Sequence, residues 1–385
     1  LSTIIAKHDC KTKHGIEMHT DDPHLVGRTL ADGTTITKGN IESIKKRGAT
    51  VIVRSPATCE LPHGVCQKCY GIDEYGHLPD IGKNIGVQAS QSISEPLTQG
   101  AMKTFHLGGT ASGGGGVTGG FEVVSNFLEA PETFKNKAAL AYQTGKITKI
   151  EAGSAGGHNV WINDHPHFVN ATKDQLTVKV GDNVNKGDLL NHGIPHPKEA
   201  LKLLGEIKGI QKVTDTLHKI YKDSGIKTDR RNLETVVRGM TGFGIIHDEG
   251  THPNFVTNDV VPLSSISEWN QKALTPTKLH VKDAYGMILH KDAGGVKAGT
   301  RIDKDVISKL EKTHSAVEVK HTPIQYERTL MGVSQAPMKS QNWMAHLGFR
   351  YLKRGLQDAA TYGYQSDIHG HNPIPAFITG EIGEH

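Results

Sequence analysis

The chain has 385 residues, of which 36% are hydrophobic and 44 are glycines, and its formal net charge at pH 7 is +4. This length exceeds that of one typical domain, so several structural units are expected. The small positive charge permits contact with a polyanion without requiring it. The sequence contains no apolar run of about 18 residues and no signal-peptide pattern at its start, which argues against a membrane span and a secretory signal.

Four cysteines lie near the start of the chain, at Cys10, Cys59, Cys66 and Cys69. Cys66 and Cys69 form a C-x-x-C pair, a spacing that places two thiolates on one edge of a zinc tetrahedron. Cys59 is close upstream, and Cys10 is expected as the fourth ligand from a distant segment. His63 is a rival ligand that we rank below Cys10. Four unliganded thiols or a redox pair are the other interpretation.

A strand is expected within residues 49–59, leading into the C-x-x-C segment. A helical pattern follows from Val87. Pro96 is expected to interrupt or kink that helix because it lacks an N–H and crowds the preceding turn. The pattern resumes over 99–106.

The glycine tract 113–116 ends this helix, and a second short helix is expected over 120–132. Two helical segments joined by a glycine-rich loop form a helix–hinge–helix device, because glycine readily absorbs changes in φ and ψ.

Residues 145–193 alternate short β-prone runs with Gly, Asp and Asn turns, which indicates a small β unit. The rhythm of "VKVGDNVNKGDLL" is typical of barrel-sandwich hairpins. Helices are expected over 197–222, 228–241 and 341–363. No internal repeat is expected.

The segment after Pro96 carries the most suggestive chemistry. Gln99, Met102, Lys103 and His106 fall at offsets that an α-helix places on one face. Lysine and histidine suit a phosphate, and methionine adapts to a flat base. A solvated helix face is the alternative interpretation. The segment has no G-K-[ST] and is not a Walker A loop.

The run from 53 to 109, "VRSPATCELPHGVCQKCYG…VQASQSISEPLTQGAMKTFHLGG", resembles the largest catalytic (β′) subunit of multisubunit DNA-dependent RNA polymerases. The resembling parts are the family's C-terminal zinc site and the trigger loop that follows it. The segment "KHDCKTKHGI" matches the position of the family's first zinc cysteine, which supports Cys10 as a ligand. The resembling pieces together span most of the chain, and the resemblance is much weaker over 1–50, 136–175 and 245–325.

The resemblance implies roles for four residues of the segment 99–106, which we call the hinge helix. Met102 would pack on the base of the incoming nucleotide, Lys103 and His106 would approach its phosphates, and Gln99 would act at the sugar. In such polymerases this helix folds onto a correct nucleotide and releases after its addition. Catalysis would then depend on positioning and charge neutralisation.

The hinge helix departs from the family pattern at three positions. Lys103 stands where the family usually has Arg, which replaces a planar fork with a point charge. Gly100 and Ala101 stand where Leu-Thr is usual, which weakens the helix. We therefore expect a slower or more loosely closing loop.

The family's metal-binding signature, Asn-Ala-Asp-Phe-Asp-Gly-Asp, does not occur in the sequence, and no bridge helix is evident. The resemblance thus implies that a partner chain holds the catalytic Mg²⁺ ions. The chain would be the C-terminal piece of a split β′ subunit, similar to the polymerases of giant bacteriophages.

The closing helix carries Arg350, Lys353 and Arg354 at i, i+3 and i+4, a cationic stripe that suits a phosphate backbone. A solvated face balanced by Asp358 is the alternative. The resemblance favours nucleic-acid contact because this segment matches the family's clamp-base and switch region.

The expected fold is mixed α+β and built of several parts: a zinc knuckle, a trigger-loop helix pair, a small barrel-sandwich-like β unit and a C-terminal helical clamp segment. The expected boundaries are 1–86 for the zinc-binding region, 87–135 for the trigger loop, 136–196 for the β unit, 197–325 for a helical and mixed region, and 326–385 for the clamp segment.

The expected function is that of a β′ fragment in a nucleotidyltransferase complex, with structural Zn²⁺ in this chain and Mg²⁺ in a partner. Expected partners are other polymerase subunits, template DNA, RNA and NTPs, with no membrane. The expected location is the cytoplasm of a bacterial host, with the virion as a second location. The alternative is a non-catalytic, zinc-dependent nucleic-acid-binding or assembly subunit. A lipoyl-type carrier is excluded because no attachment turn is present.

Overall fold

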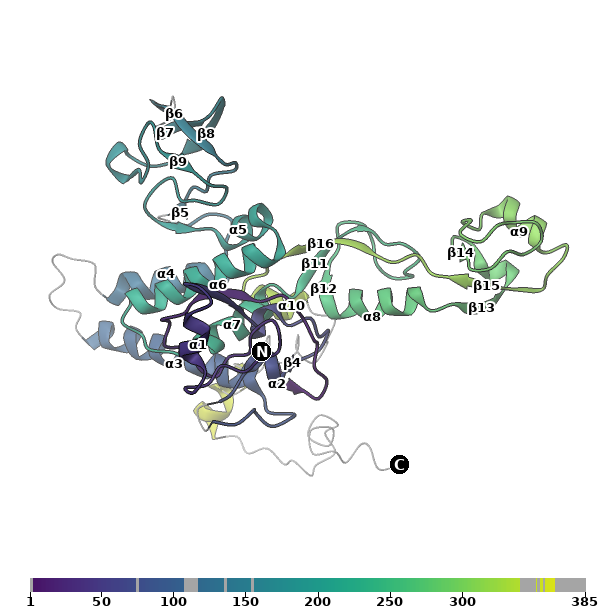
Figure 1. The fold of residues 1–385 in the computed structure, drawn as a ribbon, viewed down its shortest axis with the longest axis horizontal. Coiled ribbons are helices and arrows are strands. Elements are labelled where there is room, and N and C mark those ends of the chain that lie inside the picture. The colour runs from purple at the N-terminus through teal and green to yellow at the C-terminus, as the bar shows by residue number, and fades with distance from the viewer. Residues whose placement is uncertain are drawn as a thin grey trace. The chain divides into compact units, whose positions relative to one another are not determined.

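In a computed structural model of the chain, the described residues are 3–73, 76–106, 117–134, 137–153, 156–339, 351, 354–355 and 357–363, with the side chains of 97–121 excepted. The chain divides into two units, Leu1–Ala336 and Pro337–His385. In the second unit, helix is found at 351, 354–355 and 357–362. All sheets and cores described below belong to the first unit (Figure 1).

The described helices are α1 (Ile41–Lys45), α2 (Gln67–Tyr70), α3 (Ile85–His106), α4 (Val117–Glu129), α5 (Pro197–Leu204), α6 (Glu206–Asp223), α7 (Arg230–Met240), α8 (Leu263–Leu274), α9 (Lys304–Leu310) and α10 (Gln335–Lys339). Short 3₁₀ helices lie at η1 (Pro56–Thr58), η2 (Lys173–Gln175) and η3 (Val281–Ala284).

The described strands are β1 (Ile5–Ala6), β2 (Ile16–His19), β3 (Thr50–Val53), β4 (Val65–Cys66), β5 (Lys137–Ala138), β6 (Gly145–Ala152), β7 (His158–Ile162), β8 (His165–Val169), β9 (Asn183–Val184), β10 (Ile194–Pro195), β11 (Phe243–Asp248), β12 (Val260–Pro262), β13 (Thr277–His280), β14 (Ile288–Leu289), β15 (Ala316–Lys320) and β16 (Gln325–Thr329). They form small separate sheets, in the orders β1-β4, β2-β3, β10-β5, β12-β11-β16, β13-β15-β14 and β8-β7-β6-β9. The fold is therefore mixed α and β, as expected.

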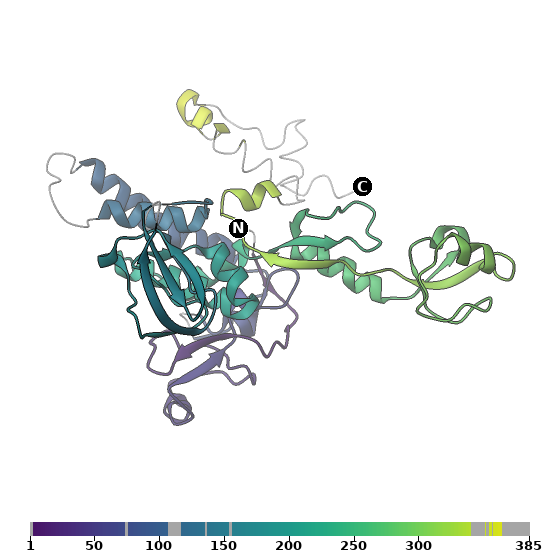
Figure 2. The ribbon, with the colours of Figure 1, turned by 90° about the horizontal axis from the view of Figure 1, so that it is seen from above.

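The largest core lies among α3, α4, α6 and α7. Helices α3 and α4 lie side by side in both views (Figure 1, Figure 2) and are linked in the chain by residues 107–116. Buried residues of this core recur at helical spacing, including Ala89, Ile93, Val124, Phe127, Ile210, Val213, Leu217, Leu233, Val236 and Val237. Packing of these amphipathic faces, rather than propensity alone, stabilises the helices.

Of the two outcomes predicted at Pro96, the interruption is absent, because helix α3 continues through this residue, and the kink stays a prediction. Burial of Ile93 and its neighbours in the core outweighs the loss of one backbone hydrogen bond. The expected helix over 197–222 is instead two helices, because Gly205 adopts φ +78° between α5 and α6. Glycine takes this conformation without the steric cost that other residues meet.

The expected β unit is present as a four-stranded antiparallel sheet, β8-β7-β6-β9, with a core of its own. Alternate residues of β7 and β8 are buried, including Val160, Ile162 and Val169. This period of two is typical of strands with one buried face, whereas the prediction rested on short β-prone runs separated by Gly, Asp and Asn turns.

Candidate metal centre and its surroundings

The four cysteines come from separate short elements that the fold brings together. Strand β1 pairs in parallel with β4, with Ala6 opposite Cys66, and this pairing carries the following Cys10 to the C-x-x-C segment. Cys66 caps α2, because its Sγ accepts the main-chain N–H of Cys69 at 3.4 Å. Cys59 follows η1 directly.

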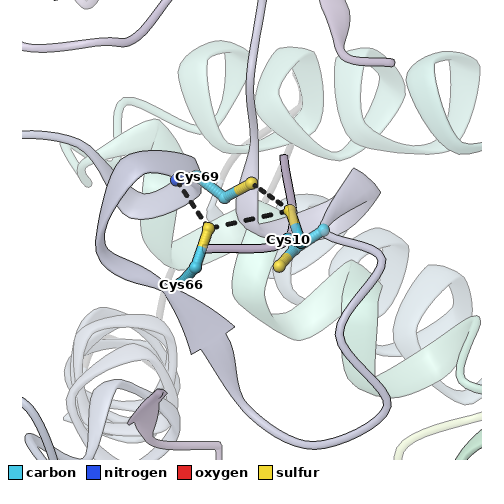
Figure 3. Close-up of side chains that lie close together, drawn as sticks. Cys10, Cys66 and Cys69 are labelled. Carbon is cyan, nitrogen blue, oxygen red and sulfur yellow. Dashed lines mark hydrogen bonds between the residues drawn. The ribbon is translucent and has the colours of Figure 1, made fainter. Parts of the chain in front are cut away.

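The ligand atoms of Cys10, Cys59, Cys66 and Cys69 all lie within 4.8 Å of one another. Figure 3 shows three of these side chains converging, with Cys10 Sγ 3.7 Å from Cys66 Sγ and 3.5 Å from Cys69 Sγ. A tetrahedron with metal–sulfur bonds of about 2.3 Å has edges of roughly 3.8 Å. The spacing fits a tetrathiolate metal site.

The fourth position belongs to Cys10, as expected. The rival His63 instead lies with its Nε2 2.5 Å from Glu268 Oε1, with both side chains largely exposed. Among the residues that the structure describes, the four cysteines are the one group whose spacing could hold a metal ion.

A buried cation lies against the sulfur cluster. The guanidinium of Arg54 donates to Cys10 Sγ at 3.3 Å, to Cys66 Sγ at 3.2 Å and to Cys69 Sγ at 3.4 Å. It also pairs with Asp9. A tetrathiolate with a divalent cation carries two negative charges, and Arg54 offsets part of that charge where water is excluded.

Asp9 in turn orients Arg54. Its carboxylate lies 3.2 Å from Lys68 Nζ and accepts the main-chain N–H of Lys11 at 2.9 Å. Burial alone would raise the pKa of Asp9, but the hydrogen bond from Arg54 and these other donors hold it well below its usual range. The carboxylate is therefore charged at neutral pH.

The thiols perturb one another strongly. Hydrogen bonds from Cys59, Cys66 and Cys69 hold the pKa of Cys10 far below its usual range. The pKa values of Cys59 and Cys69 are raised, chiefly because each donates to Cys10. Such a cluster shares its protons, and a bound divalent cation would displace them. This donor set is one that soft or borderline metal ions prefer.

Two arginines of helix α7 bind the segment that carries the cysteines. Arg238 donates to the carbonyl oxygens of Cys59 at 2.5 Å and Leu61 at 2.6 Å. Arg231 donates to the carbonyl of Ile72 and lies over the ring of Tyr70, 5.3 Å from its centroid. These charge-assisted bonds fix the segment on both sides of the C-x-x-C pair.

A second buried network involves the same helix. Glu234 is fully buried, and its carboxylate accepts two hydrogen bonds from the buried Arg28, at 2.6 and 2.7 Å. It also accepts from Ser55 Oγ at 2.7 Å and Arg230 Nε at 3.2 Å. Every lone pair of this carboxylate has a partner, as a charge in this position requires.

Neither network was foreseen from the sequence. Arg54 lies in the run that carries the family resemblance, but no local sequence pattern predicts that its side chain contacts the cysteine sulfurs. Arg28 and Glu234 are far apart along the chain, so their pairing leaves no periodic or spacing signal. The sequence of α7 alone does not show that its charged residues are buried; the packing of the helix does.

The hinge-helix residues lie on α3, whose backbone extends to His106. The side chains of Gln99, Met102, Lys103 and His106 lie outside the described residues, so their grouping remains a prediction. The same holds for Arg350 and Lys353.

Arg354 is described, and its Nε lies 3.9 Å from Asp358 Oδ2 with the arginine side chain 85% exposed. That pair is expected to contribute little stability because solvent screens it. In the part of the chain that the structure describes, no helix is both long and apolar enough to cross a bilayer.

Comparison with known proteins gives a family match and several relatives. The family described as RNA polymerase Rpb1, domain 5, matches residues 2–258. The β′ subunit of DNA-directed RNA polymerase from Thermosipho africanus (strain TCF52B) is 26% identical over 382 residues, covering 90% of this chain and 23% of the relative.

The corresponding subunit of Corynebacterium aurimucosum is 29% identical over 364 residues, covering 87% of this chain and 23% of the relative. That of Nocardioides sp. (strain ATCC BAA-499 / JS614) is 25% identical over 406 residues, covering 95% and 27%. The chain thus spans about a quarter of the length of these relatives. The chain belongs to the RNA polymerase Rpb1 domain 5 family and corresponds to a C-terminal part of the β′ subunit.

Proposed function

We propose that this chain supplies the trigger loop of a multisubunit DNA-dependent RNA polymerase, in complex with other subunits, template DNA, RNA and NTPs. One observation carries the proposal: the motif from Gln99 to Gly109 stands at the end of α3, before a glycine-rich link to α4, and lies inside the family match. A helix ending in such a link can fold and unfold at its end while its beginning stays packed.

The beginning of α3 is suited to anchor such a motion. Ala89 and Ile93 are buried against α4 and α7. Ser92 Oγ lies 2.8 Å from Thr228 Oγ1 and accepts from Asn232 Nδ2 at 3.0 Å. These contacts hold the first turns in place whatever the last turns do.

In the proposed mechanism the last turns of α3 close on the incoming nucleotide. Met102 packs on the base, Gln99 approaches the sugar, and Lys103 and His106 neutralise charge on the phosphates. Preorganised donors aimed at developing charge are commonly the largest contribution to such catalysis. The aspartates that hold Mg²⁺ would come from outside these 385 residues.

The cysteine cluster would hold Zn²⁺ in a structural role. All four positions of its tetrahedron are taken by sulfur, which leaves no open site for a substrate. Cys10, Cys59, Cys66 and Cys69 would bind the ion. Arg350, Lys353 and Arg354 would contact a nucleic-acid backbone, which contributes affinity without reading sequence.

Single-nucleotide addition by the assembled polymerase tests the proposal. Met102→Ala and His106→Ala should each lower the rate, by about 10²-fold where a stabilising donor is lost. Lys103→Arg should raise it, because the planar fork can bind phosphate through two bonds. Lys309→Arg, an exposed lysine on α9, is the matched control and should change nothing.

Unchanged rates in all three hinge variants would instead favour the alternative, a non-catalytic zinc-dependent assembly subunit. Gly100 and Ala101 are the observation behind that alternative, since glycine in a helix costs about 1 kcal/mol relative to alanine. Replacing both residues by Leu-Thr should speed closure if the loop is active.

A further inference from the structure

Two segments of the chain share one fold. We define copy 1 as residues 16–54 and copy 2 as residues 277–320. In copy 1, β2 pairs antiparallel with β3, with Ile16 opposite Val53. In copy 2, β13 pairs antiparallel with β15, with Thr277 opposite Val319. A short helix, α1 or α9, precedes the second of these strands in each copy.

The main-chain hydrogen bonds recur at equivalent positions. In copy 1 they join Gly27 N–H to Ile36 O (2.8 Å), Ile36 N–H to Arg28 O (2.7 Å), Leu30 N–H to Thr34 O (2.8 Å), Ala31 N–H to Ile52 O (3.2 Å) and Thr20 N–H to Ala49 O (2.9 Å). In copy 2 they join Gly286 N–H to Ile302 O (2.8 Å), Ile302 N–H to Met287 O (2.8 Å), Leu289 N–H to Thr300 O (3.0 Å), His290 N–H to Glu318 O (2.8 Å) and Val281 N–H to Ser315 O (3.2 Å).

The sequences agree at four core positions and at two exposed lysines. Residues 36–54 align with 302–320 without a gap, and the identical pairs are Ile36 and Ile302, Lys38 and Lys304, Ile41 and Ile307, Lys46 and Lys312, Val51 and Val317, and Val53 and Val319. The expectation of no internal repeat is therefore wrong. Copy 2 lies beyond residue 258, where the family match ends.

Copy 1 is docked on α6 and α7 through its outer face. The main chain of Glu17, on the edge strand β2, exchanges two hydrogen bonds with the side-chain amide of Gln211, both at 3.1 Å. The carbonyl of Gly27 accepts the N–H of Ile72 at 2.7 Å. Arg28 reaches the buried carboxylate of Glu234.

The same face of copy 2 lacks these partners. Val281 bonds to Ser315, so the alternation of an antiparallel ladder turns the main-chain groups of Lys278 away from β15. Among the described residues, neither the Lys278 main chain nor the Gly286 carbonyl has a hydrogen-bond partner on this side. An edge strand left open in this way can pair with another molecule.

The side chains on this face differ between the copies in a consistent way. Lys278 replaces Glu17 and Lys282 replaces Asp21, so the charge is reversed; both lysines are exposed. In copy 1, Asp21 and Lys222 of α6 both line a cleft of about 890 Å³, and Asp21 pairs with Lys45 of the same copy at 3.3 Å.

The centre of the face also changes, from ionic to apolar. Tyr285 stands where copy 1 has Val26, because Met287 N–H bonds to Ala284 O as Arg28 N–H bonds to Leu25 O. Tyr285 is 60% exposed, against 43% for Val26. Met287 takes the place of Arg28 and is half-buried. An exposed tyrosine beside a methionine is typical of the centre of a protein interface, whereas a nucleic-acid backbone needs neither.

We propose that copy 2 is a docking module for an acidic-flanked, apolar-centred helix of another protein subunit. The helix would lie on copy 2 as α6 lies on copy 1. Its acidic side chains would face Lys278 and Lys282, and its apolar side would cover Tyr285 and Met287. A polar side chain would reach the open edge of β13, in the manner of Gln211 on β2.

Photo-cross-linking in the purified native complex tests this proposal. A benzophenone amino acid replaces Tyr285, and the matched control carries it at Tyr142, which is also 60% exposed but lies before β6. We expect the probe at position 285 to link to one helix of a partner subunit, mapped by mass spectrometry to a segment rich in Asp and Glu. Links to nucleic acid, equal yields at both positions, or no link at 285 would each overturn the proposal.

Charge reversal gives an independent measurement. Lys278→Glu with Lys282→Glu should reduce the cross-link at least about tenfold, because like charges would then face each other. Lys304→Glu with Lys309→Glu, on the exposed side of α9, should leave the yield unchanged. Hydrogen exchange of β15 checks that the module stays folded in both double variants. Equal yields from the two double variants would contradict the charge argument.

Discussion

Copy 1 and copy 2 have the same main-chain hydrogen bonds but different surroundings. Each copy has a core of its own, but copy 1 also contains the buried Arg28 and is joined to α6, α7 and the cysteine segment. The difference teaches that the inner face of this small unit specifies its fold, while its outer face can be changed from ionic to apolar without altering the backbone. The residues of the outer face, which in copy 1 contacts α6 and α7, therefore indicate what each copy binds.

Removal of the metal should produce the largest difference in hydrogen exchange between the two copies. Strand β3 of copy 1 continues through Arg54 into the cysteine cluster, whereas β15 of copy 2 has no such link. A structural zinc ion contributes apparent binding energies of about 10 kcal/mol or more to the part that folds around it. We expect a zinc chelator to abolish slow hydrogen exchange in β3 while β15 keeps its protection.

The control for this measurement is a calcium chelator, which should have no effect on either strand. Cys59→Ser should reproduce the effect of zinc removal without any chelator. Equal loss of protection in β3 and β15 would show that the two copies are not independent.

Replacing Arg28 by the residue of copy 2 should have the next largest effect. Arg28→Met leaves the carboxylate of Glu234 buried with one charged partner fewer, and breaking a buried pair in this way costs about 3–5 kcal/mol. Urea unfolding of the chain in its complex, with hydrogen exchange of β3, measures the loss. Adding Glu234→Leu should recover part of it.

The reciprocal change is the control. Met287→Arg buries no carboxylate but disturbs a side chain packed on the core of copy 2, so it should lower the free energy of unfolding by about 1 kcal/mol, well below the loss from Arg28→Met. A large loss from this variant, or none from Arg28→Met, would contradict the view that only copy 1 depends on its outer face.

The sequence predicted the parts of the molecule whose signals are local. The C-x-x-C spacing identified the cysteine cluster, and short β-prone runs separated by Gly, Asp and Asn turns identified the β unit that contains β7 and β8. The fourth ligand, Cys10, was expected correctly because its surroundings resemble the family. The break at Gly205 could also have been predicted, since a glycine after Leu203 and Leu204 is a common helix end.

The remaining features depend on distant contacts or on weak similarity. The pairing of Arg28 with Glu234 joins residues that no periodicity links. The repeat was missed because the loop between Leu289 and Ile302 is longer than the loop between Leu30 and Ile36, and because the cores tolerate changes such as Ile44 to Leu310. Apolar volume and hydrogen bonding are retained there while residue identity is not.

The edge strands β2 and β13 should show a smaller difference in amide exchange. Gln211→Ala removes both hydrogen bonds to Glu17, but water can replace them at this exposed edge, so the loss should be about 1 kcal/mol or less. The Glu17 amide should then exchange up to roughly tenfold faster, approaching the Lys278 amide of copy 2. Lys208→Ala, at an exposed position of the same helix, is the control. An unchanged Glu17 amide would show that Gln211 does not hold the edge.

The smallest expected difference between the copies is in how their hydrogen exchange depends on pH. His218 of α6 faces His24 of copy 1, with ring centroids 5.7 Å apart, and Arg230, Asp22 and Asp215 are the charged groups around it. Burial lowers the pKa of His218 below its usual 6.5, and the nearby Arg230 and His24 add to the effect. The unfolded chain therefore binds a proton more readily than the folded chain.

The stability that this histidine contributes is present above pH 6.5 and is lost as the pH falls toward its lowered pKa in the folded chain. Copy 2 has no residue at the position of His24, because Val281 and Gly286 are two residues closer in the chain than Thr20 and Gly27, so β15 should show no matching change. Hydrogen exchange of β3 between about pH 7.5 and pH 5.5, compared in the parent chain and in His218→Gln, isolates the contribution. The parent should lose more protection than the variant on acidification, because only the parent must protonate a group that docking of copy 1 keeps neutral. Parallel losses in the two proteins would place the pH dependence in other histidines.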